Sequence, residues 1–154
     1  MAFEGWTDDV YDDLCEATAA TLEAKAAEIP SPGFETPTVY GVVKPRVVGP
    51  NTICVGWASG SFDDEAGVEY VTVEVQYLLR QLSMDVADTE IRKAARRIAR
   101  IIQRDHLRHF ANGGWGVSGI ELMNGIIADA DYYENPGAKR YDGAIITVTF
   151  VRGN

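Results

Sequence analysis

The sequence is poor in residues that build disulfide or metal scaffolds, and in segments that enter membranes. Its 154 residues include 2 cysteines and 2 histidines. Cys15 and Cys54 fall in different predicted elements with no metal ligand at motif spacing, so we expect two reduced thiols. The acidic stretch 1–13 lacks the basic segment followed by an apolar segment that marks a secretory signal. No apolar run approaches the roughly 20 residues that span a bilayer. We therefore expect a cytoplasmic chain that is not an integral membrane protein.

A nucleotide-binding loop is suggested by spacing alone. Gly114, Gly116 and Gly119 fit the pattern G-x-G-x-x-G. In dinucleotide folds this pattern follows a strand and opens a helix, whose N-terminus holds the phosphate. Here it follows a predicted helix and precedes a predicted strand. The order is reversed, so we interpret the pattern as a loop and predict no cofactor.

Catalytic and metal-binding groups are equally sparse. His106 and His109 share one side of a predicted helix beside Asp105, but no third ligand is identifiable, so we predict no metal site. Ser118 lies outside any G-x-S-x-G elbow, and neither histidine has a spacing that brings it to the serine. We expect no enzyme. A small hydrolase using Ser118, His106 and Asp105 is the alternative, and mutation of those residues would test it.

Length and composition indicate one folded domain spanning residues 1–154. Hydrophobic residues make up 46% of the chain and charged residues 24%, which is ordinary for a globular protein. A chain of this length can bury one sizeable core and has little room for a second.

Charge is unevenly distributed along the chain. The net charge is -9, yet half of the 14 basic residues lie between positions 92 and 108. Five arginines there recur at steps of four and follow one side of a predicted helix, while the chain begins with an acidic cluster. These residues are the candidate subunit or partner interface: Asp8, Asp9, Asp12, Asp13, Arg92, Arg96, Arg100, Arg104 and Arg108.

The arginine stripe has three interpretations. It is a solvated helix face, a surface for an acidic protein partner, or a surface for a nucleic-acid backbone. The overall acidity argues against direct nucleic-acid binding. If identical subunits packed head to tail, the acidic first helix of one could face the stripe of the next, and such contacts generate rings or filaments.

Periodicity predicts an α+β fold in the order α-β-β-β-α-β-β, with a mostly antiparallel sheet packed by an N-terminal helix and a long central helix. Thr7 is the candidate N-cap of a first helix that ends before Pro30, and Asp88 is that of a second helix that ends near Phe110. Strands are expected at residues 39–43, 52–57, 68–82, 120–133 and 144–151. Loops are expected at residues 30–37, 59–67 and 113–119.

This order of elements resembles the tail-terminator and related tail-completion, or head-tail joining, proteins of long-tailed bacteriophages. The resemblance covers most of the chain and rests on ordinary residues in sequence order, with no signature motif. The segments that carry it are the N-terminal helix, the strand YVTVEVQY at 70–77, the helix 88–110, the strand GIELM at 119–123 and the strand AIITVTF at 144–150.

The resemblance implies a sheet flanked by helices and a homo-oligomeric ring, a hexamer, that caps the tail tube and presents a surface to the head. Its implied partners are further copies of the chain, the tail tube protein and a neck or connector protein. Its implied location is the virion tail or neck, after assembly in the host cytoplasm. No catalytic residues come with it. The alternatives are a neck or head-tail connector protein and, from another class, a nucleic-acid-binding module using the arginine-rich helix.

Overall fold

The described residues form two helices and five strands in the order α-β-β-β-α-β-β, which confirms the expected α+β class. The computed structural model describes residues 5–30, 36–43, 51–63, 65–79, 88–109, 113–128 and 140–153. The elements are α1 (Val10–Ala24), a short 3-10 helix (Ala26–Glu28), β1 (Thr38–Tyr40), β2 (Asn51–Asp63), β3 (Val68–Leu79), α2 (Asp88–His109), β4 (Gly116–Ala128) and β5 (Arg140–Gly153).

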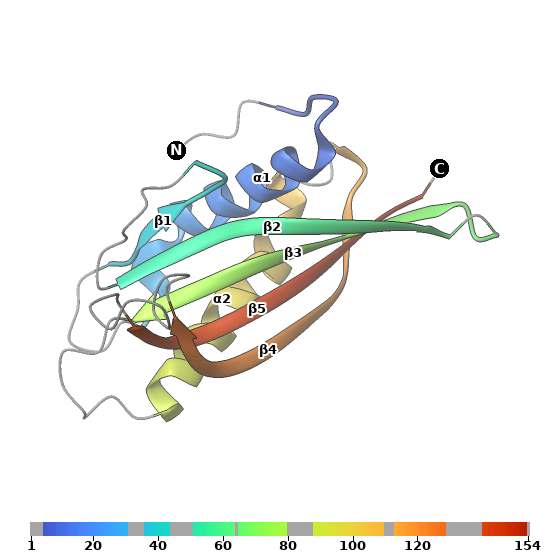
Figure 1. The fold of residues 1–154 in the computed structure, drawn as a ribbon. Helices are drawn as coiled ribbons and strands as arrows, with labels where there is room; N and C mark the ends of the chain where they lie inside the picture. The colour runs from blue at the N-terminus through green and yellow to red at the C-terminus, as the bar shows by residue number, and fades with distance from the viewer. Residues whose placement is uncertain are drawn as a thin grey trace.

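The strands form one mixed sheet in the order β1-β2-β3-β5-β4 (Figure 1). β1 lies parallel to β2, and the other three pairings are antiparallel. β5 is the last strand in the sequence but lies between β3 and β4. Among the strands that the structure describes, the edges are therefore the short β1 and the long β4.

Both helices lie on the same face of the sheet and bury its apolar side chains (Figure 1). On β3, Val71, Val73 and Val75 are fully buried while the residues between them are half-buried, which is the alternation of a sheet with one covered face. Ile98 and Phe150 are also fully buried. The core therefore lies between the helices and the three long central strands.

Gly143 on β5 marks a close backbone contact in this core. A Cβ added at Gly143 would collide with the carbonyl oxygen of Tyr77 on the neighbouring strand β3. Tyr77 is itself fully buried. Only glycine therefore lets β5 approach β3 closely enough to complete the ladder at this point.

The second face of the sheet is not covered by either described helix (Figure 1). Along it, the hydroxyls of Thr72 and Thr149 lie 3.3 Å apart across β3 and β5. The side-chain amide of Gln76 donates a hydrogen bond of 2.8 Å to Glu74. These polar, half-buried rows are typical of a sheet face that meets water.

Several boundaries differ from the expectations, and one capping residue is wrong. The first helix, expected to end before Pro30, ends at Ala24 and is followed by the 3-10 helix Ala26–Glu28. The N-cap of α1 is Asp9, whose carboxylate accepts from the backbone N–H of Asp12, whereas the Thr7 hydroxyl contacts Asp13. The expected loop 59–67 is strand as far as Asp63, and the expected turn 113–119 is strand from Gly116. β1 spans three residues rather than five.

Other expectations fall partly or wholly outside the described residues. They concern the loop at 31–35, the strand continuations at 80–82 and 129–133, the end of the second helix at 110–112 and the Asp88 side chain. Of the helices that the structure describes, neither combines the length and apolarity needed to cross a bilayer.

Candidate assembly interface

The arginine face of α2 is separated from its buried face as the sequence predicts. Ile91 is 3% exposed, and Ile98, Ile101 and Ile102 are fully buried on the sheet side. The arginines at steps of four lie on the opposite, exposed side of the helix: Arg92, Arg96, Arg100 and Arg104. They extend over about 18 Å of helix axis. The side chain of Arg108 lies outside the described residues.

Most of this positive charge is not neutralised within the described part of the chain. There, no carboxylate forms an ion pair with Arg92, Arg96 or Arg100. Arg104 lies 3.4 Å from Glu28, in a pair whose side chains are 51% and 38% exposed. An ion pair this exposed contributes about 0–1 kcal/mol to stability. The face therefore keeps most of its attraction for an external anionic group.

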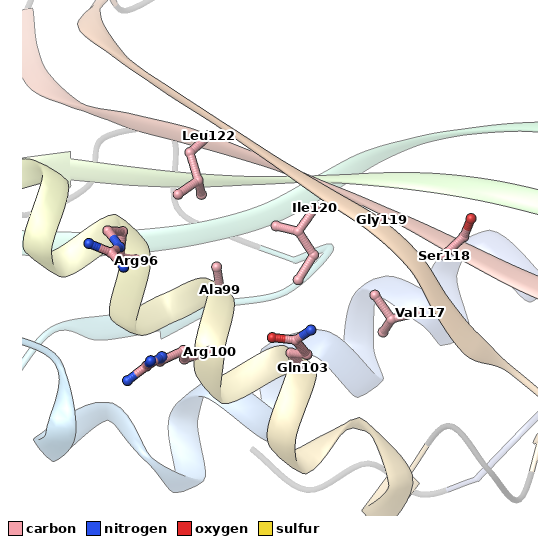
Figure 2. A pocket seen from close by; sticks show the side chains of 9 residues that line it. All are labelled: Arg96, Ala99, Arg100, Gln103, Val117, Ser118, Gly119, Ile120 and Leu122. Carbon is pink, nitrogen blue, oxygen red and sulfur yellow. The ribbon is translucent and has the colours of Figure 1, made fainter.

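A groove of about 430 Å³ lies between α2 and the edge strand β4 (Figure 2). Val117, Ile120 and Leu122 point from β4 toward the helix, and Ala99 leaves room beneath them. The helix side of the groove is polar: Arg96, Arg100 and Gln103. The groove therefore offers an apolar wall on β4 and a cationic wall on α2.

β4 leaves this groove open because it is an incompletely covered edge. It pairs with β5 on one side, and none of the described strands pairs with its other side. Leu122 is 41% exposed and Met123 is 64% exposed. Residues 116–128 contain no lysine or proline, the residues that commonly protect an edge from further pairing. An irregularity at Ser118 bends the strand at the end of the groove.

The acidic residues of the candidate interface lie at the start of α1, and one of them is internal. Asp8, Asp9 and Asp12 are exposed. Asp13 is 7% exposed, and its carboxylate accepts from the backbone N–H of Thr7 at 2.6 Å and from the Thr7 hydroxyl at 3.0 Å. Asp13 therefore stabilises the beginning of the helix and is removed from the surface that a partner could reach.

The pKa of Asp12 reflects the crowding of negative charge at the start of α1. Its pKa is raised from the usual value, first by partial desolvation and then by the neighbouring carboxylates of Asp9, Glu16 and Asp13. The charged form of Asp12 is therefore disfavoured in the isolated subunit. A cationic surface placed against it would relieve that repulsion.

The turn between β2 and β3 is a second acidic site, and Tyr11 connects it to α1. A Cβ added at Gly60 on β2 would lie 2.6 Å from the Tyr11 hydroxyl, so the ring packs directly over that glycine. Two residues further along the same side of β2, Phe62 is 68% exposed. Asp63 and Glu65 follow it and are exposed. The turn therefore combines a large exposed aromatic ring with carboxylates.

No known protein-family model matches this chain, and no curated protein matches it significantly.

The remaining candidate residues are not assembled into a site by the described part of the chain. Gly116 and Gly119 lie within β4, and Gly114 precedes it with a positive φ of 79°. Ser118 lines the groove, whereas the side chains of Asp105, His106 and His109 lie outside the described residues. No group of three or more His, Cys, Asp or Glu side chains among the described residues could hold a metal ion. Cys15 and Cys54 are buried thiols on α1 and β2.

The apolar part of the candidate interface was not predicted from the sequence. Phe62 fell in an expected loop, and Val117 in an expected turn. The alternation of Ile120, Glu121 and Leu122 was recognised as a strand, but only the sheet order makes it an edge. A strand signal with a single charge and no proline is the feature that could have identified this edge in advance.

Proposed function

We propose that this chain is a structural subunit of a long-tailed bacteriophage: a tail terminator that forms a homohexameric ring, caps the tail tube and joins the tail to the head. The observation that carries the proposal is the separation of two complementary surfaces on one subunit. An arginine-lined groove lies between α2 and β4, and carboxylates gather at the start of α1 and at the β2–β3 turn.

Unlike surfaces on one subunit associate head to tail. Such heterologous contacts close into a ring when the rotation between neighbours permits it. The α+β order that resembles the tail-terminator family supports the same conclusion. In this proposal the chain has no catalytic role, acts within the virion tail or neck, and contacts further copies of itself, the tail tube protein and a neck or connector protein.

The test combines solution mass with binding to tail tubes. Light scattering of the purified chain should give a mass that falls as salt rises. Salt screens the attraction between the exposed charges of neighbouring subunits, with a Debye length of about 10 Å at 0.1 M. Electron microscopy of the low-salt species should show rings. The chain should also bind preformed tail tubes at one end.

Two other results would redirect the assignment. Binding to portals or filled heads but not to tail tubes would identify a neck or connector protein instead. Tight binding to DNA that weakens steeply with salt would identify a nucleic-acid-binding module, for which exposed Arg92, Arg96 and Arg100 are the observation in favour.

A further inference from the structure

The chemistry of the groove between α2 and β4 restricts what can fill it. One wall presents Ile120 and Leu122, and the other presents Arg96 and Arg100. A purely acidic segment would leave the apolar wall exposed to water. A purely apolar segment would bury guanidinium groups without hydrogen-bond partners, which costs free energy. The occupant must therefore bring an apolar side chain and carboxylates together.

The β2–β3 turn carries that combination on this same chain. Phe62 is the largest strongly exposed apolar side chain among the described residues, and Asp63 and Glu65 are close to it in sequence. The Asp63 carboxylate accepts from the backbone N–H of Ala66 at 3.0 Å, and Gly67 closes the turn with a φ of 68°. Hydrogen bonds thus join Asp63 to Ala66 and Gly67 on the two sides of the turn, so docking orders few new groups among them.

The turn cannot reach the groove of its own subunit. β2 and β3 carry it beyond the ends of both helices, on the side of the molecule away from β1 (Figure 1). The groove lies against the middle of α2. A contact between the two therefore requires a second copy of the chain.

We propose that the β2–β3 turn of one subunit docks into the groove between α2 and β4 of the next, with Phe62 against Ile120 and Leu122 and the turn carboxylates facing Arg96 and Arg100. This inference rests on the ring-forming part of the proposed function and names the contact that makes the ring. The start of α1 lies beside the end of β2 that leads to this turn, because Tyr11 packs on Gly60. The contact would therefore also include the exposed carboxylates of Asp8 and Asp12.

Site-directed cross-linking tests the contact directly. Phe62→Cys chains are mixed with Leu122→Cys chains and treated with a short bis-maleimide. Both native cysteines are buried, so the new thiols are the accessible ones. A heterodimer joining one chain of each kind is expected. Val43→Cys is the matched control because Val43 is 86% exposed and lies next to β1, and its mixture with Leu122→Cys should give no heterodimer.

The energetics are tested by paired substitutions at exposed positions, which leave folding intact. Phe62→Ser should weaken self-association at least about tenfold, as expected for an aromatic anchor at the centre of an interface. Val43→Ser should leave association unchanged. Glu65→Arg and Arg100→Glu should each weaken association, and mixing the two variant chains should restore it between unlike subunits.

The outcomes separate this inference from the proposed function. Rings that bind tail tubes but give no Phe62–Leu122 product, or give as much product with the Val43 control, would overturn the docking contact and leave the tail-terminator assignment standing. If the expected cross-link forms but the chain does not bind tail tubes, the docking contact is supported and the tail-terminator assignment is overturned. A chain that gives no product at any concentration would also overturn the contact.

Discussion

The guanidinium carbon of Arg152 lies 4.5 Å from the centroid of the Trp115 ring. The same guanidinium donates a hydrogen bond of 2.9 Å to Glu69 on β3. Trp115 is 2% exposed and immediately precedes β4. One side chain of β5 therefore joins the segment that leads into β4 to the strand on the other side of β5.

Replacing Arg152 with methionine should lower the free energy of unfolding by about 1–2 kcal/mol. The substitution removes the cation from the indole ring and leaves the Glu69 side chain, which is 12% exposed, without its charged donor. Urea denaturation measures the change. In a double-mutant cycle with Glu69→Gln, strictly additive losses would show that the two side chains are not coupled.

Asp13 and its neighbour Asp12 provide a matched pair of substitutions. Asp13→Ala should destabilise the fold by about 1–3 kcal/mol, because the Thr7 backbone N–H and hydroxyl lose their acceptor. Asp12→Ala should not destabilise the fold, because that carboxylate is exposed and binds neither group. Thermal unfolding followed by circular dichroism compares them. Equal losses in the two variants would contradict the helix-start role assigned to Asp13.

The raised pKa of Asp12 predicts a direction of pH dependence. The folded chain binds the Asp12 proton more tightly than the unfolded chain does, so this group makes stability fall as pH rises from its usual value through the raised value. Asp12→Asn should therefore be more stable than the wild type at pH 7, and the difference should shrink in acid. Denaturation at several pH values measures it. A variant that is less stable than the wild type at pH 7 would contradict the prediction.

Gly143→Ala should prevent the native sheet from forming, because the added methyl group meets the Tyr77 carbonyl oxygen between paired strands. We expect a loss of more than about 4 kcal/mol, the range of severe core defects. Gly116→Ala is the control, since a Cβ there meets nothing within 4 Å. Soluble yield and near-ultraviolet circular dichroism distinguish the two. A folded Gly143→Ala variant would show that β5 can move away from β3.

The order of elements was predictable because the apolar residues of each long element recur at the spacing of a helix or of a strand. The alternation from Val71 to Tyr77 and the helical spacing from Ile91 to Ile102 are local properties, and the structure confirms both. The same holds for the exposure of Arg92, Arg96 and Arg100, which follows from their position opposite the isoleucines.

The errors arose where distant pairing overrides local preference. Ser59, Gly60 and Ser61 have low strand propensity, yet they lie opposite Thr72, Val71 and Tyr70 in the β2–β3 ladder. Gly116 begins β4 because Val151 lies opposite it. Thr7 does not cap α1 because its hydroxyl contacts the Asp13 carboxylate. None of these partners is visible in a local window of sequence.

The groove depends on a further level of organisation. Its residues come from α2 and β4, and its openness comes from the position of β4 at the edge of the sheet. That position is set by β5, which enters the sheet between β3 and β4. The charge of the groove was therefore predictable from Arg96 and Arg100, and its apolar wall was not.

The placement of β5 also orders events during synthesis. The β2–β3 hairpin can form as soon as its residues emerge, but the second edge of β3 stays open until residues 140–153 have left the ribosome. Glu69 and its partner Arg152 are separated by 83 positions, which makes this pairing slow relative to the hairpin. A nascent chain stalled before β5 would expose an unpaired edge of β3, a strand that lies in the interior of the finished sheet.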